Sequence, residues 1–453
     1  MTGWRLDMSK NLNMTQGNPL RLLIRFALPL MFGNVFQQLY MLVDTAIVGR
    51  GVGLDALAAL GCVDWLNWMM LGLAQGFTSG FSVRVAQKFG EGDQEGMQAF
   101  MGQSAVATGV LAVLCMVLGQ VMLPLFLLFL RVPDDLYSLS ALYTRILFAG
   151  LPGVFFFNYC SAMLRAVGDS KTPLIAVTAA SFTNILLDIV AVFMLRWGVT
   201  GAAIATVVSQ CLSGIICWVK IRRTPQLSFA KGCLRPRRDI LTNLLKIGMP
   251  AAGKNLVIAV GGMVVMTVVN TFGTTFIAGV TASNKLYGLL EIAALSYGYA
   301  ITTYVGQNYG AMRYDRIRAG IKSAAYLSVV TAVVISVLMF LFGRPITMLF
   351  ISAEDPAQAI QAGTVAYRYL CVMASCLPVL YLLYLLMSAL QGMGDTVRPM
   401  ISGIVELVMR TAVAVAVAYT GYAMGIFGAE VAAWFGSTLY LWYHFRKRMK
   451  KEI

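Results

Sequence analysis

Long apolar runs separated by short polar breaks dominate this chain. About twelve runs of 20–30 residues carry few charged side chains, and each is long enough to cross a hydrocarbon core of roughly 30 Å. Only helices and closed barrels satisfy the backbone inside a bilayer, so runs of this length predict helices. The predicted spans are residues 20–48, 56–82, 98–124, 138–164, 173–195, 199–219, 241–269, 276–305, 319–342, 362–389, 399–420 and 424–444.

The pattern also repeats once along the chain, at a spacing of about 220 residues, far longer than the period of a solenoid. The paired positions are Pro29 with Pro250, Asn34 with Asn255, Gln87 with Gln307, Gly90 with Gly310, Pro152 with Pro378, Leu164–Pro173 with Leu390–Pro399, and Gly198–Ala205 with Gly425–Ala432. A hydrophobic chain built from two related halves is typical of a secondary transporter whose binding site lies between or within the halves.

The repeat divides the chain into a lobe at residues 1–222, a basic cytoplasmic linker at 223–238 and a second lobe at 239–453. Six spans in each half mean that both halves enter the membrane in the same direction. We therefore expect an all-α membrane protein with twelve transmembrane helices in two six-helix lobes. The lobes should be related by a pseudo-two-fold axis along the membrane normal.

Composition agrees with a bilayer environment, because 58% of the residues are hydrophobic and only 12% are charged. The formal net charge of +15 is spread unevenly: the loops on the side of the two termini carry most of the Lys and Arg. This is the positive-inside pattern, which predicts a multi-pass protein of the cell (inner) membrane with both termini in the cytoplasm. The charge is explained by topology and contact with anionic lipid, and we expect no nucleic-acid partner.

Cysteine and histidine exclude several chemistries. The eight Cys residues form no CxxC pair and lie mostly inside spans, and the single His, His444, lies at the end of the last span. A disulfide framework, a His- or Cys-based metal site and a histidine proton relay are therefore not expected. Without a nucleophile–base set or a catalytic metal set, the chain is not expected to be an enzyme or to hold a cofactor.

Ionisable groups inside spans are costly and so mark functional candidates. Asp44 lies in the first span, and Asp188 lies in the fifth with Asn184 one turn before it. Counted at 1.5 Å per residue, Asn158 and Thr206 lie at a depth similar to that of Asp188. The resulting set of oxygen-bearing side chains suits Na⁺, with Asp44, Asn184 and Asp188 as its core, and dehydrated carboxylates could carry H⁺ instead. In the alternative interpretation, Asn158, Asn184 and Thr206 only hold helices together.

The motifs together resemble the multidrug and toxic compound extrusion family of cation-coupled exporters. The resemblance covers nearly the whole chain and depends on Pro29, Asp44 and Gly49-Arg50 in the first span, the Gln87…Gly90 loop, LRAVGD with its downstream Pro, and GVTGAAIAT, all echoed in the second half. It implies twelve helices in two lobes and outward export of amphipathic, often cationic compounds driven by Na⁺ or H⁺.

The resemblance is nearer to the DinF-like branch of that family than to the NorM-like branch. In the DinF-like branch a cation site in the N-terminal lobe matches this chain residue by residue, at Asp44, Asn158, Asn184, Asp188 and Thr206. NorM-like members carry acids in spans seven and ten, whereas residues 254–262 and 378–390 contain none here. The resemblance therefore implies coupling through the N-terminal lobe.

Other polar residues in spans have two interpretations each. Glu291 has no partner nearby in sequence, so a substrate-facing acid is one expectation, and Lys254 could pair with an acid or line the cleft. Glu406 and Arg410, four residues apart, can pair with each other. The remaining expectations place Gln37 and Tyr40 in the substrate cavity, Pro29 at a hinge, and Glu430 and Asp64 near helix ends without a special role.

The sequence thus predicts a monomeric secondary antiporter that works by alternating access. It would export amphipathic, cationic drugs or toxic metabolites in exchange for Na⁺ or H⁺. The alternative is a lipid-linked oligosaccharide flippase of the same superfamily, which should line its cavity with several basic groups. Buried basic residues are few here, and the pattern names neither the substrate nor the coupling ion.

Overall fold

Helices account for nearly all of the computed structural model, which describes residues 12–130, 132–229, 232–348, 351 and 356–451. No strand occurs among these residues. The first half contains α1 (Pro19–Gly51), α2 (Leu54–Glu91), α3 (Gln94–Phe129), α4 (Asp134–Ala149), α5 (Leu151–Ala166), α6 (Lys171–Asp188), a π-helix (Ile189–Met194) and α7 (Gly198–Arg223). The second half contains α8 (Arg238–Val269), α9 (Thr274–Gly310), α10 (Tyr314–Met348), α11 (Pro356–Ser375), α12 (Leu377–Gly392), α13 (Val397–Thr420) and α14 (Gly428–Lys451).

The described helices make twelve passages, as the hydropathy pattern predicts. Eight helical stretches are long and apolar enough to cross a membrane, and nine if the bent pair α4–α5 counts as one span. The remaining three passages, α2, α9 and α14, are 38, 37 and 24 residues long and carry more polar side chains. Apolar side chains such as Val121 and Leu128 of α3 are 70% and 73% exposed, as expected of groups that face lipid.

Two of these passages are irregular in ways that the hydropathy pattern does not predict. The passage predicted at residues 138–164 is bent by 44° between α4 and α5, where Pro152 occupies the first turn of α5 and has no N–H to donate. The passage predicted at 173–195 changes from α-helix to π-helix directly after Asp188. Single π-turns inside helices are frequent at functional sites.

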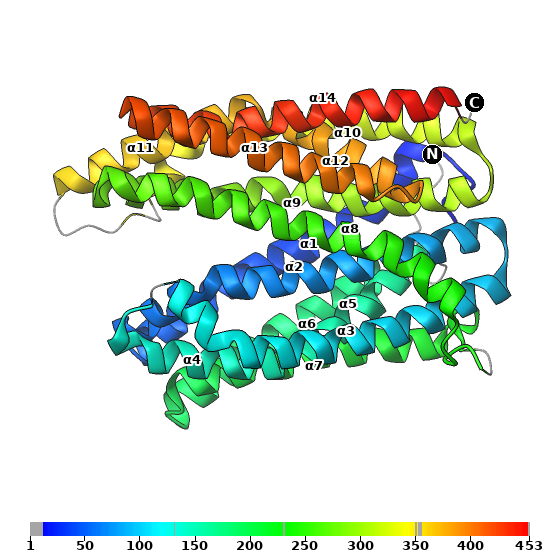
Figure 1. Ribbon diagram of the computed structural model, residues 1–453, viewed down its shortest axis with the longest axis horizontal. Coiled ribbons are helices and arrows are strands. Elements are labelled where there is room, and N and C mark those ends of the chain that lie inside the picture. The colour runs from blue at the N-terminus through cyan, green and yellow to red at the C-terminus, as the bar shows by residue number, and fades with distance from the viewer. Residues whose placement is uncertain (1–11, 131, 230–231, 349–350, 352–355, 452–453) are drawn as a thin grey trace, which may run out of the picture.

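The two halves form two neighbouring lobes, and the start of α1 and the end of α14 lie at the same end of the bundle (Figure 1). We call this the basic end, since Arg21, Lys88, Arg238, Arg313 and Arg448 all lie close to it. An even number of passages requires the termini to share a side. The positive-inside rule predicts that this side is the cytoplasm.

The first helix of each half joins the two lobes at the basic end. Leu23 and Phe26 of α1 are buried in the same apolar core as residues of α9 and α10. In the corresponding arrangement, Ile240 and Leu244 of α8 pack with Phe81 of α2. Each lobe therefore contributes one helix end to the core of the other.

A pair of symmetric contacts closes the basic end. Gln87 Nε2 donates to the carbonyl oxygen of Gly392 at 3.0 Å, and Gln307 Nε2 donates to that of Ala166 at 2.8 Å. Gly90 and Gly310 lie so close to the opposite lobe that a Cβ at either would overlap the backbone of Gln307 or Gln87, respectively. The Gln of each repeat thus contacts the Gly of the other repeat across the lobe interface.

Candidate functional site in the N-terminal lobe

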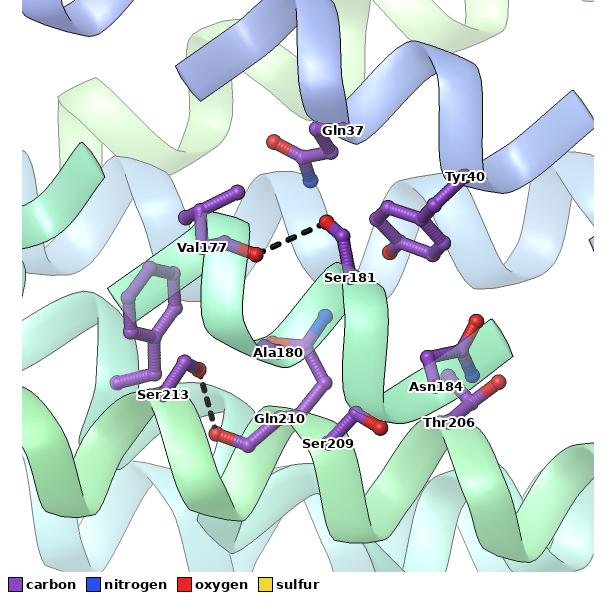
Figure 2. Close-up of a pocket in the computed structure, with 11 residues that line it drawn as sticks. Gln37, Tyr40, Val177, Ala180, Ser181, Asn184, Thr206, Ser209, Gln210 and Ser213 are labelled. Carbon is purple, nitrogen blue, oxygen red and sulfur yellow. Dashed lines mark hydrogen bonds between the residues drawn. The ribbon is translucent and has the colours of Figure 1, made fainter. Parts of the chain in front are cut away.

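A narrow polar pocket lies inside the N-terminal lobe, between α1, α5, α6 and α7. Figure 2 shows Gln37 and Tyr40 on one side and Asn184, Thr206 and Gln210 on the other. Its full lining is Gln37, Tyr40, Phe157, Val177, Ala180, Ser181, Asn184, Thr206, Ser209, Gln210 and Ser213. The free space holds on the order of one water molecule, so it suits a small ion better than a drug-sized ligand.

Unsatisfied acceptors cluster beside this pocket. Both carboxylate oxygens of Asp188, Oδ1 of Asp44 and both polar side-chain atoms of Asn184 are buried without a hydrogen-bond partner. The Asp44 and Asp188 carboxyl groups lie within hydrogen-bonding reach of each other if one carries a proton. None of the described ion pairs includes either carboxyl group. Buried charges need a partner, so this cluster fits a cation that comes from outside the chain.

Tyrosine hydroxyl groups complete the surroundings of the two carboxyl groups. The Tyr40 hydroxyl interacts with the side chain of Gln210 and lies near both Asp44 and Asp188. Tyr143 of α4, which is 8% exposed, also lies within electrostatic range of both acids. Asp44 comes from α1, whereas Asn184 and Asp188 end α6 at its junction with the π-helix. The donor set therefore holds two carboxylates, one amide and nearby hydroxyl groups, which is chemistry that suits Na⁺ or H⁺.

Asn158 and Thr206 take different places in this arrangement. Thr206 lines the pocket next to Asn184, whereas Asn158 does not, and its Nδ2 donates to the carbonyl oxygen of Val154 in its own helix at 2.9 Å. Gln37 and Tyr40 line the same small pocket, inside one lobe and not between the lobes. Pro29 lies inside the continuous helix α1.

Three polar residues of α7 line the pocket but are absent from the set that the sequence predicts. Ser209, Gln210 and Ser213 are successive polar positions on an otherwise apolar helix. Their spacing within little more than one helical turn is the signal that identifies them, because such a group on one face is unusual in a membrane span.

A second charged cluster lies in the C-terminal lobe. Arg410 Nη2 lies 3.4 Å from Glu406 Oε2 and 2.7 Å from Glu430 Oε2, so the predicted Glu406–Arg410 pair is present. The expectation that Glu430 has no special role is wrong, because α14 brings it into this pair from another helix. Glu291 accepts a hydrogen bond from the Tyr384 hydroxyl, and Lys254 lies within electrostatic range of Glu406 and Glu291.

The repeat relates this cluster to the pocket of the N-terminal lobe. In the register that aligns Leu164–Pro173 with Leu390–Pro399, Asn184 corresponds to Arg410 and Asn158 corresponds to Tyr384. The second lobe therefore places a fixed guanidinium where the first lobe has an unpartnered amide. In the first lobe two neighbouring carboxylates, those of Asp44 and Asp188, lack a positive partner among the described residues.

We expect Arg410→Ala to destabilise the protein by about 3–5 kcal/mol, because it leaves Glu406 and Glu430 buried without a counter-charge. Thermal unfolding of the purified protein in detergent measures the effect. Replacing Glu406, Arg410 and Glu430 together with Leu should recover most of the loss, since no charge is then left unpaired. If the triple variant is no more stable than Arg410→Ala, the ion pairs are not what holds these helices together.

The chain belongs to the MatE family, whose sequence profile matches residues 29–190 and 250–416. The two matched segments begin at Pro29 and Pro250, which the internal repeat also pairs. The profile match covers both lobes and supports the family assignment that the sequence motifs suggest. It does not separate the DinF-like branch from the NorM-like branch.

Similar proteins have been described from several bacteria. The probable multidrug resistance protein YoeA of Bacillus subtilis is 29% identical over 73% of this chain and 73% of its own. The probable multidrug resistance protein NorM of Thermotoga maritima is 28% identical over 84% of this chain and 81% of its own. A solved structure of a MOP superfamily transporter from Pyrococcus furiosus covers 98% of this chain and 99% of its own, with a TM-score of 0.91 and 23% identity. That structural likeness confirms the fold of two six-helix lobes.

Proposed function

We propose that this protein is a secondary multidrug exporter that releases amphipathic, cationic compounds in exchange for Na⁺ or H⁺. Membership of the MatE family and the names of the bacterial relatives support drug efflux. The observation that carries the coupling mechanism is the set of unpartnered buried acceptors on Asp44, Asn184 and Asp188. Acceptors that lack an internal positive partner need an exchangeable one.

In this proposal the coupling ion enters the N-terminal lobe and is held by Asp44 and Asp188, with Asn184, Thr206 and the Tyr40 hydroxyl nearby. Ion binding neutralises the two carboxyl groups and so changes how α1 packs on α6, which are in contact in this structure. Pro29 lies on the basic-end side of Asp44 in α1, where the helix lacks one backbone hydrogen bond and bends more easily. If the ion binds more tightly to one arrangement of the lobes and the substrate to the other, ion binding favours release of the substrate.

The substrate would bind elsewhere, because the pocket beside Asp188 is too small for a drug-sized compound. Glu291 and Lys254 remain candidates for this role in the C-terminal lobe. Glu291 has no ion-pair partner within 4 Å among the described residues, and its one hydrogen bond comes from Tyr384. A carboxylate next to an aromatic hydroxyl group suits an organic cation.

Transport in proteoliposomes tests the proposal. The purified protein is reconstituted into vesicles, and the vesicles are loaded with a fluorescent organic cation. A Na⁺ gradient and a pH gradient are then imposed across the vesicle membrane in separate experiments. We expect efflux to follow one of the gradients and to stop when an ionophore collapses it. A fluorescent organic anion of similar size is the matched control and should not be exported. Absence of gradient-driven transport for every cation tested would contradict the proposal.

A further inference from the structure

A second pocket lies at the basic end, at the boundary between the lobes. It has a cavity volume of about 250 Å³ and is open to the surface. Arg84 of α2 lines it from the first lobe, while α8, the turn before α13, and α14 line it from the second. The residues from the second lobe are Asn243, Lys246, Ile247, Gly394, Asp395, Thr396, Val397 and Arg448.

Positive charge in this pocket exceeds negative charge. Arg84 donates to two neutral side chains, Asn243 and Gln87, each at 2.8 Å. None of the described ion pairs includes Arg84 or Lys246. The one acid in the lining, Asp395, already pairs with Arg398 and Arg448. The N-terminus of the 24-residue helix α13 also lies at this pocket, and its free N–H groups add to the positive potential there.

The symmetric position in the other half is filled by the chain itself. Residues 12–17 lie there and supply backbone oxygens to two arginines. Arg316 donates to the carbonyl oxygens of Met14 at 3.3 Å and Gly17 at 2.9 Å, and Arg313 donates to that of Thr15 at 3.0 Å. Met14 N also donates to Gln307 Oε1 at 2.9 Å. These two arginines correspond in the repeat to Asp93 and Gly96 and not to Arg84, and they are satisfied by acceptor oxygens from the N-terminal segment.

The chain segment that corresponds to residues 12–17 in the second half goes elsewhere. In the register that pairs Pro29 with Pro250 these residues correspond to 233–238, which pack against α3. Gln103 Nε2 donates to the carbonyl oxygens of Cys233 and Arg235, both at 2.7 Å, and Gln103 Oε1 accepts from Arg237 N at 2.8 Å. No described backbone carbonyl oxygen therefore accepts a hydrogen bond from Arg84 or Lys246, and the two acceptors of Arg84 are the neutral side chains of Asn243 and Gln87.

We propose that this pocket binds a phosphate group, which bridges the two lobes through Arg84, Lys246 and Arg448. Guanidinium and ammonium groups are the usual protein ligands of phosphate oxygens, and basic pockets between helices on the cytoplasmic side suit lipid headgroups. The phosphate can belong to an anionic phospholipid or to a soluble compound. Because Arg84 comes from one lobe and Lys246 and Arg448 from the other, the bound group stabilises the arrangement in which the basic end is closed.

Thermal unfolding of the purified full chain with defined probes tests this site. The probes are short-chain phosphatidylglycerol, inorganic phosphate and, as a zwitterionic control, short-chain phosphatidylcholine. We expect phosphatidylglycerol to raise the melting temperature in a saturable manner, and Lys246→Gln to weaken the apparent affinity about tenfold, the loss of one charged contact. The Lys246 side chain is exposed and makes none of the described hydrogen bonds, so this variant should fold as the unaltered protein does.

Two further variants make the result decisive. Arg84→Gln should weaken binding as Lys246→Gln does, whereas Lys220→Gln, an equal change of charge on exposed α7, should not. Stabilisation by phosphatidylglycerol alone assigns the phosphate to a lipid, and equal stabilisation by inorganic phosphate assigns it to a soluble compound. The site is refuted if no phosphate probe stabilises the protein more than phosphatidylcholine does, or if both pocket variants bind as tightly as the unaltered chain.

Discussion

Asp188→Asn should abolish gradient-driven efflux while leaving the protein folded. Asparagine has nearly the same shape as aspartate but removes a charge that no described side chain neutralises, so the change should relieve a buried charge and not create one. Loss of one charged ligand is worth about 1.5–3 kcal/mol, which corresponds to a fall in ion affinity of about 10- to 150-fold. Efflux in proteoliposomes and ion-dependent thermal unfolding measure the two effects separately.

Asp44→Asn should produce the same loss, and the double variant should be no worse than either single one, because the two carboxyl groups act on one ion. Asp55→Asn, in the first turn of α2, is the matched control and should transport normally. If efflux stays coupled to the gradient in both Asp44→Asn and Asp188→Asn, the pocket in the N-terminal lobe is not the coupling site.

Gly90→Ala should stop transport by preventing closure of the basic end. An added methyl group would overlap the carbonyl oxygen of Gln307, and Gly310→Ala would meet that of Gln87 in the same way. Both glycines lie in the last turn of their helices with negative φ, which alanine adopts without strain, so lower stability of the helices themselves does not explain a loss. We expect efflux near background and faster hydrogen exchange at the ends of α2 and α9.

Gly61→Ala is the control for this effect, because a methyl group at Gly61 of α2 meets nothing within 4 Å. It should leave both transport and hydrogen exchange unchanged. Normal efflux by Gly90→Ala and Gly310→Ala would mean that the contact between these turns is not part of the transport cycle.

Much of this fold can be predicted from the sequence, because a bilayer allows few kinds of backbone structure to cross it. Apolar runs of span length predict helices, and the pairing of Pro29 with Pro250 predicts two related lobes, as the structure and the family match confirm. Asp44 and Asp188 stand out for the same reason, since an acid inside a span needs a function to offset its cost. These inferences need only composition along the chain.

Features that depend on contacts between distant segments do not appear in such patterns. The repeat pairs Gln87 with Gln307 and Gly90 with Gly310, but only the packed lobes show that Gly90 lies against Gln307 and Gly310 against Gln87. Glu430 lies 20 residues from Arg410, so the i, i+3 and i, i+4 spacings of a helix do not predict their ion pair. The pair forms only because α13 packs against α14. The π-helix that follows Asp188 is not predicted by the hydropathy pattern either.

Asn158 shows the limit of assigning a side chain by depth. Its amide donates within its own helix and it does not line the pocket, whereas Ser209 and Gln210 do. Depth along a helix follows from counting residues, whereas the direction of a side chain depends on helix rotation.

The segment at residues 12–17 has a mechanical consequence for a protein whose lobes move. It is covalently continuous with α1, and Leu12 N donates to the carbonyl oxygen of Gly168 in the same lobe, whereas it also bonds to Gln307, Asn308, Arg313 and Arg316 of the other lobe. It therefore ties the first lobe to the second at the basic end, and residues 233–238, its counterpart in the repeat, are tied to Gln103 of the first lobe. We expect the lobes to stay joined at both segments while they tilt against each other.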